Sequence, residues 1–341
     1  MRIIFIILII ISYNKSIYAK SLFETNFYEI SFVSNNIDEY KINKINEIKN
    51  DSINKIFKQI LVKEDFLKLK KSINIDLINT FIKNIIINDE KIIDQYYFSR
   101  IKINFNKKNI INYLRKYEIP YVEYHPKDFL TIIYEKNNLS KILFSTKNLH
   151  YDFIKKNNNN YYKVPNLDIN DKYMLGYLDI ENNNYERIKS FINKYSKDEA
   201  VIITADYENN KIKYKILLYL NNSFSNLSNL ESMDNNLNLF FDNLYEILID
   251  EWKIKNKIQN KFINIINCEI NYFNLLELKQ IKNNLSDISI IKKYNLKKIS
   301  LNKNKYDIHY FGNIEVMIKL LHLNDLRLKL DTNNHCKIYL K

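Results

Sequence analysis

Glycine is almost absent from this chain, which contains only Gly176 and Gly312 among its 341 residues. Loops that cradle phosphate groups need several glycines, because the backbone must approach the ligand closely. A Walker-type nucleotide loop and a dinucleotide-binding fingerprint are therefore excluded. The turn that presents the nucleophilic serine of α/β-hydrolases also depends on glycines and is excluded for the same reason.

Arginine is scarce as well, since only five of the 52 basic residues are arginine and the rest are lysine. The net charge of +13 alone would suggest a nucleic-acid partner. Arginine, however, is the residue that makes bidentate contacts with phosphates and bases, so its scarcity argues against nucleic acid. Lysine, asparagine, isoleucine and tyrosine are frequent together, which indicates an AT-rich genome. We interpret the charge as a solvated lysine-rich surface, with an anionic membrane or polymer partner as the alternative.

Cysteine and histidine are too few and too scattered to predict a metal site. The five histidines show no H-E-x-x-H spacing, and the two cysteines form no C-x-x-C motif and no zinc-binding spacing. We therefore expect neither a metal nor another cofactor. An oxidising compartment would permit a disulfide between Cys268 and Cys336. The strand order expected below places them on strands that are not neighbours, so the geometry favours two separate thiols.

The first 19 residues have the pattern of an export signal. Arg2 precedes an apolar run over 3–11, and Ala19 is the small residue that a signal peptidase requires. A retained membrane anchor is the alternative, but a helix of that apolar run rises only about 14 Å against a hydrocarbon core of roughly 30 Å. Later apolar runs are interrupted by Lys, Asn or Asp, so no stable membrane span is expected. Cleavage after Ala19 would leave 322 of the 341 residues with a charge of +11.

The remaining chain has the composition of a globular protein. Hydrophobic residues make up 46% of the sequence, and 27 Tyr and 19 Phe supply large side chains for the cores. Its length suits several modules better than one. We expect an α+β fold of two or three small modules, each a mixed or antiparallel sheet covered by helices. The expected ranges are 20–124, 125–260 and 261–341.

Local patterns predict the elements of the first two ranges. In the first we expect a strand (25–33), a long amphipathic helix capped by Asn36 or Asp38 and ending near 62, a helix (75–87), a strand (95–105) and a helix (108–117) stopped by Pro120. In the second we expect a buried strand (128–135), a helix (185–195), a hairpin (200–206 with 211–220), a flexible connection (221–236) and a helix (237–254).

The last range has the order β-α-β-β-α-β, the ferredoxin-like split βαβ arrangement. The expected strands are 263–269, 288–294, 307–311 and 327–330, and the helices are 272–284 and 314–323. An additional strand over 335–340 is expected at the edge of this sheet. The first and last core strands are neighbours in this topology, which separates Cys268 from Cys336.

The order of these features resembles the exported proteobacterial proteins of domain-of-unknown-function family 2066. The matching segments are KQILVKEDFLKL (58–69), DQYYFSRIKINFN (94–106), YLRKYEIPYVEYHPKDFLTIIYE (113–135) and VPNLDINDKYML (164–175). The last resembles the Pro-x-x-Asp segment of that family, with Pro165 and Asp168 in place. A glycine expected near VIITADY and tryptophans of the following strand are absent. The resemblance implies a bacterial periplasmic protein without known catalytic residues.

Four residues are the candidates for chemistry. Glu123 and His125 are close together after Pro120 and could act as acid and base, although a linker position is the simpler interpretation. Asp168 and Asp171 form the second candidate pair and are both acidic, although an aspartate after Pro165 more often caps a helix.

We therefore predict a mainly monomeric binding or assembly module of the cell envelope, whose partner is an unidentified envelope protein or polymer. Exposed sheet edges could accept strands from partner proteins. The alternative is a hydrolase that acts on an envelope polymer with Asp168 or Glu123 as the acid or base.

Overall fold

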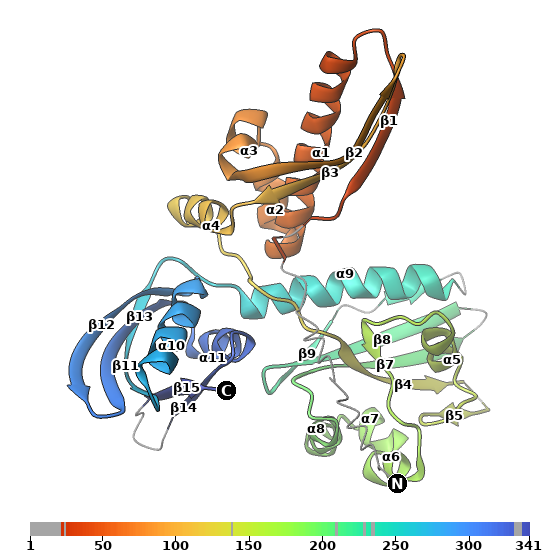
Figure 1. Cartoon of the computed structure of the whole chain (residues 1–341). Helices are drawn as coiled ribbons and strands as arrows, with labels where there is room; N and C mark the ends of the chain where they lie inside the picture. The colour runs from red at the N-terminus through yellow and green to blue at the C-terminus, as the bar shows by residue number, and fades with distance from the viewer. Residues whose placement is uncertain are drawn as a thin grey trace, which may run out of the picture.

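The fold was analysed in a computed structural model, which describes residues 22–23, 25–137, 139–208, 211–227, 230–232, 236–330 and 336–341. The predicted export signal lies outside these residues. Three separate sheets are present, which confirms the α+β class with mixed or antiparallel sheets covered by helices. The strands of each sheet come from one of the three expected ranges. Figure 1 shows the three sheets as distinct bodies.

The first sheet contains three antiparallel strands in the order β1-β3-β2, formed by β1 (Tyr28–Val33), β2 (Ile82–Ile93) and β3 (Tyr96–Phe105). Its helices are α1 (Ile37–Ile60), α2 (Lys63–Lys70), α3 (Ile75–Phe81) and α4 (Lys107–Lys116). Asn36 caps α1 by accepting the amide of Glu39 at 3.3 Å, as one of the two predicted caps. The helix α4 ends before Pro120, as predicted.

The predicted helix over 75–87 is wrong beyond Phe81. Residues from Ile82 onward form β2, which pairs with β3 along most of its length. The apolar run Ile85, Ile86 and Ile87 fits helical and strand periods equally well, and isoleucine is β-branched. Pairing with β3 therefore makes this segment a strand and not a helix.

The second sheet is a central layer between two helical layers. Its strands follow the order β10-β8-β7-β4-β5, with β6 paired to β4 and β9 paired to β8. The strand β4 is parallel to β7 and buried on both faces, and β7 forms a hairpin with β8. The bounds are β4 (Phe129–Lys136), β5 (Lys141–Ile142), β6 (Tyr162–Lys163), β7 (Glu199–Glu208), β8 (Lys211–Leu220), β9 (Ser223–Asn226) and β10 (Leu230–Ser232).

Two hydrophobic clusters occupy the two faces of this sheet. One contains side chains of α5 (Leu149–Lys156) and α9 (Leu237–Asn256). The other contains side chains from the opposite helical layer, formed by α6 (Ile169–Met174), α7 (Tyr177–Glu181) and α8 (Tyr185–Lys194). The predicted flexible connection over 221–236 is wrong in part, because β9 and β10 form there by pairing with β8.

The third sheet follows the predicted element order but has a different strand order, β12-β13-β11-β15-β14. Its elements are β11 (Ile263–Asn271), α10 (Leu275–Asp287), β12 (Ile291–Ser300), β13 (Lys303–Phe311), α11 (Ile314–Leu323), β14 (Leu326–Leu330) and β15 (Cys336–Leu340). The last strand was expected at the edge. It lies instead between β11 and β14, parallel to the former and antiparallel to the latter.

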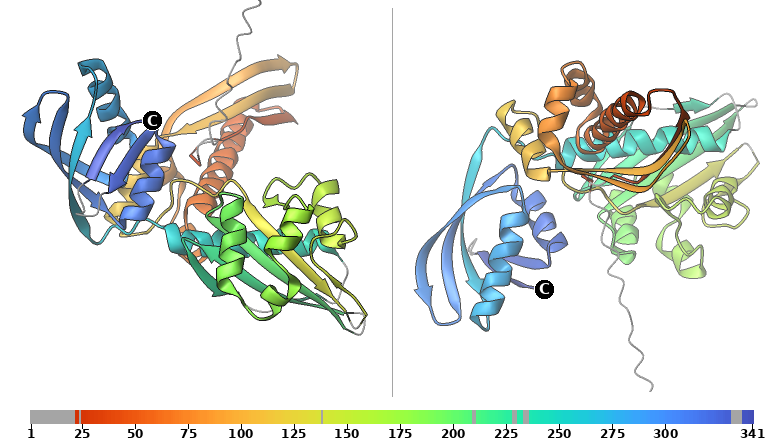
Figure 2. Two further views of the ribbon diagram at one scale, coloured as in Figure 1. Left: turned by 90° about the horizontal axis from the view of Figure 1, so that it is seen from below. Right: turned by 45° about the horizontal axis from the view of Figure 1, so that its top comes forward.

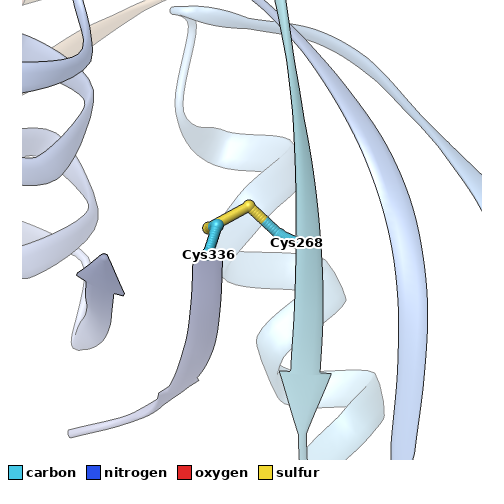
Figure 3. The surroundings of a disulfide bond; sticks show 2 residues. All are labelled: Cys268 and Cys336. Carbon is cyan, nitrogen blue, oxygen red and sulfur yellow. A yellow bond between two sulfur atoms is a disulfide. The ribbon is translucent and has the colours of Figure 1, made fainter. Parts of the chain in front are cut away.

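This inserted strand brings the two cysteines together and makes the prediction of separate thiols wrong. Cys268 on β11 and Cys336 on β15 are register partners, with Cα atoms 4.4 Å apart, and they form a disulfide (Figure 3). Both are almost fully buried. The disulfide closes a chain segment of 68 residues that includes α10, α11 and three strands.

The helix α9 lies where the three parts meet (Figures 1 and 2). Its Lys253 ammonium donates to the carbonyls of Lys58, at 2.6 Å, and Leu61, at 2.8 Å, at the end of α1. Tyr121 forms an isolated antiparallel β-bridge with Ile258, and its hydroxyl lies 2.8 Å from Ser289 Oγ. The first and third sheets therefore share one continuous hydrophobic cluster.

We expect the disulfide to contribute measurably to stability. Replacing both Cys268 and Cys336 with alanine should lower the free energy of unfolding by about 2–4 kcal/mol, because the unfolded chain regains the freedom of a long loop. Denaturant titration with and without dithiothreitol measures this. The reductant should destabilise the natural protein by a similar amount and leave the double variant unaffected. An equal response of both proteins to the reductant would contradict the assignment.

Candidate functional site

Asp168 and Asp171 lie together at the start of α6, where they organise the helix. Asp168 is the N-cap and accepts the amide of Asp171 at 2.9 Å, which agrees with the capping interpretation. Asp171 is fully buried. Its carboxylate accepts hydrogen bonds from Lys194 at 2.7 Å, from the Tyr195 hydroxyl at 2.6 Å and from the amide of Leu167 at 2.8 Å. All of its acceptor capacity is directed to the protein itself.

Glu123 and His125 lie in the segment that connects the first and second sheets. The Glu123 side chain is 2% exposed, and its Oε1 lies 3.3 Å from Lys107 Nζ without the geometry of a hydrogen bond. The His125 ring donates from Nε2 to the carbonyl of Gln59 at 2.7 Å and packs edge-on against Trp252. Burial lowers the pKa of His125 to about 4, so the ring is neutral at pH 7.

The four predicted residues thus belong to two separate groups of contacts. The two aspartates bind groups of α8 and the loop before α6, whereas Glu123 and His125 bind groups of α4 and α1. Two open hollows of about 380 and 420 Å³ are found in the described part of the chain, and none of the four residues lines either. In that same part, no group of three or more His, Cys, Asp or Glu side chains could hold a metal ion.

The second sheet contains a buried polar network that was not predicted from the sequence. His150 donates from Nδ1 to Glu135 at 2.5 Å and accepts at Nε2 from the Tyr214 hydroxyl at 3.0 Å. The backbone amide of His150 also donates to Glu135, at 3.1 Å. Burial raises the pKa of Tyr214. These hydrogen bonds join a carboxylate, an imidazole and a phenol in one buried chain.

Access decides what this network does. His150 is completely buried, Glu135 is 5% exposed, and neither lines either of the two hollows described above. A substrate bond cannot reach the imidazole in this state. Fully satisfied buried polar groups fix a unique core packing. The signal for it was weak, since His150 lies in LHYDF (149–153), a short amphipathic stretch, and Glu135 lies near the end of a buried strand 15 residues earlier.

The sheet edges form the second type of candidate site, because an edge strand exposes unpaired backbone amides and carbonyls. Most edges of this protein are protected. The edge strand β2 contains two irregularities in its pairing and Lys83 and Lys91, and β12 contains two irregularities and four lysines. The edge strand β14 carries Arg327 and Lys329, and β5 and β10 have only two and three residues.

The strand β1 lacks all of these protections. It pairs with β3 over six residues without a bulge and contains neither proline nor a basic residue. Residues 21–40 contain no Lys or Arg, in a chain with 52 basic residues. Among the described residues, the backbone of β1 bonds only to β3, so its other side is free to pair (Figure 1).

Side chains hold β1 firmly in an extended form. Tyr28 and Phe32 face α1: the Tyr28 hydroxyl accepts from Ser52 at 3.2 Å, and Phe32 stacks on Tyr97 with ring centroids 5.0 Å apart. The alternate residues Glu29, Ser31 and Val33 are exposed. A partner strand would therefore meet an ordered edge and would not have to order it on binding.

His125 predicts a pH dependence of stability. Its pKa falls from 6.5 in the unfolded chain to about 4 in the fold, so the unfolded state binds more protons between these values. Stability from this group should be complete above pH 6.5 and be lost as the pH falls through 4, by up to about 3 kcal/mol. Denaturant titrations from pH 7 to 4 on the natural protein and His125→Gln should diverge on acidification. Parallel curves would contradict this.

Asp171 should act as a structural residue. We expect Asp171→Asn to lower the free energy of unfolding by about 3 kcal/mol, because the amide removes the charge paired with Lys194 and keeps only one acceptor oxygen for Lys194 and Tyr195. Asp168→Asn is the matched control, since asparagine also caps helices and should change the stability by less than about 0.5 kcal/mol. Chemical denaturation followed by circular dichroism measures both. Equal stability of Asp171→Asn and the natural protein would indicate that this carboxylate serves another purpose.

The chain was also compared with known proteins. No protein-family model, curated protein or solved structure matches it.

Proposed function

We propose that this protein is an exported, non-enzymatic binding or assembly module of the bacterial cell envelope, which pairs the edge of β1 with an extended strand of a partner protein. The observation that carries the proposal is the contrast between β1 and the other edges. A free, regular, lysine-free edge is a template for another strand, and proteins without such a partner protect their edges.

Location in the envelope has two kinds of support. The N-terminal residues follow the pattern of a cleaved export signal. The disulfide Cys268–Cys336 suits an oxidising compartment such as the periplasm. In the described residues, no helix has the length and apolar character needed to cross a bilayer.

The contacts of the candidate carboxylates favour binding over hydrolysis. An acid/base pair needs two titratable groups that converge on one accessible cleft. Asp171 is buried and saturated by donors, Asp168 caps a helix, and Glu123 is buried beside Lys107. These groups are directed at the protein and not at a shared cleft.

Site-specific photocrosslinking in cells tests the proposal. A photoreactive phenylalanine analogue replaces Val33 on β1 or, as the control, Ile93 on β2, two positions with similar exposures of 67% and 63%. We expect one reproducible envelope protein to be crosslinked from position 33 and not from position 93. Mass spectrometry identifies it.

A charge variant provides a second test of strand pairing at β1. Ser31→Lys combined with Val33→Lys, with the crosslinker moved to Glu29, should reduce the product by about tenfold, because edge lysines oppose strand pairing. Ile92→Lys combined with Ile93→Lys adds the same charge at the protected edge and should have no effect. Loss of crosslinking in both variants, or no product from β1 at all, would refute pairing at this edge. Turnover of peptidoglycan fragments by the purified protein would support the hydrolase instead.

A further inference from the structure

The uncovered face of the third sheet carries a row of four lysines with one glutamate between them. Register partners place Lys298 of β12, Lys305 of β13, Glu269 of β11, Lys337 of β15 and Lys329 of β14 side by side across all five strands. The four lysines are exposed. The side chains that alternate with them pack against α10 and α11, so this row faces away from both helices.

Two pairs in this row set like charges directly opposite each other. Lys298 faces Lys305, and Lys329 faces Lys337, on strands that lie about 4.8 Å apart. Directly opposed like charges destabilise a sheet. The single acid of the row, Glu269, is engaged by Lys303 at 3.7 Å. An anionic partner would relieve this repulsion.

The rest of this face is also basic. Lys293, Lys303 and Arg327 are exposed there, and the acid Asp307 is already paired with Lys297 at 2.6 Å. In the part of the chain that the structure describes, the lysines at 293, 298, 305 and 337 have no ion pair. The face therefore presents a field of free cations on a rigid sheet, which attracts an anionic surface.

A cluster of exposed apolar side chains lies at one end of the third sheet. Phe273 is 88% exposed and belongs to the loop before α10, and Leu275 and Leu276, in the first turn of α10, are also exposed. Leu301, 90% exposed, forms the turn between β12 and β13. The two loops touch, because the amide of Tyr272 donates to the carbonyl of Asn302 at 3.1 Å. We call these four side chains the apolar tip.

We propose that the third sheet docks on the surface of a bilayer that contains anionic lipids, with its lysines on the headgroups and the apolar tip in the interface. The combination of lysines and apolar side chains distinguishes a membrane from a soluble polyanion as the partner. A soluble polyanion would use the lysines but would leave the tip in water, whereas a membrane interface accommodates both. Large apolar side chains grouped at an exposed loop are typical of an interaction site.

Co-sedimentation with lipid vesicles tests the proposal on the full mature chain. Binding to vesicles of phosphatidylcholine mixed with phosphatidylglycerol should exceed binding to phosphatidylcholine alone, and it should weaken as the salt concentration rises. Lys298→Gln combined with Lys305→Gln should lower the affinity about 30-fold. Because this variant removes an opposed pair of like charges, its melting temperature should not fall, which separates lost binding from lost folding.

Two further variants complete the design. Phe273→Ser combined with Leu301→Ser should weaken vesicle binding at least tenfold and leave binding to dextran sulfate unchanged. Lys211→Gln combined with Lys215→Gln removes the same charge from exposed positions of β8 in the second sheet and should bind vesicles as the natural protein does.

Three results would overturn the proposal. They are equal binding to both kinds of vesicle, normal vesicle binding by the Lys298→Gln/Lys305→Gln variant, and normal vesicle binding by the Phe273→Ser/Leu301→Ser variant, which would indicate a soluble polyanion as the partner. The proposal does not depend on strand pairing at β1. Vesicle binding and crosslinking from position 33 are separate measurements, and either can fail while the other holds.

Discussion

The arrangement of the three parts depends on a contact between the buried Lys253 ammonium, which belongs to α9, and the C-terminal end of α1. The ammonium donates to the carbonyls of Lys58 and Leu61, which a helix C-terminus leaves without partners. The negative end of the helix dipole favours a cation at this place. Burial lowers the pKa of Lys253 to about 8, so the ammonium is still largely protonated at neutral pH. The packing of α9 therefore positions the first sheet relative to the second.

Contacts of the segment after α4 hold the third sheet close to the same place. Tyr121 is completely buried, and its hydroxyl binds Ser289 and accepts from Arg115 at 3.1 Å. The guanidinium of Arg115 also donates to the carbonyl of Ser289 and lies over the ring of Phe311. The chain thus gathers its inter-sheet contacts in one short segment. As a consequence, β1 and the lysine row face solvent and remain available to partners.

Local patterns could predict the elements whose pairing is local and could not predict those whose pairing is distant. The hairpin of β7 and β8 and the buried strand β4 were predictable because alternation and a continuous apolar run identify them. The insertion of β15 was not, since CKIYL reads as an edge strand until its pairing with β11, 68 residues away, is known. The same limit applies to β2, whose isoleucines fit a helix equally well.

The candidate binding edge of β1 was less predictable than the fold, because it is defined by the difference between β1 and the other sheet edges. The capping role of Asp168 was predicted from its position after Pro165, but the free edge of β1 can be recognised only once the sheet order is known. Lysine abundance from an AT-rich genome would act on all exposed positions alike. It does not explain why residues 21–40 contain no basic residue while four lysines form one row across the third sheet. Both proposals rest on this uneven placement and not on the net charge.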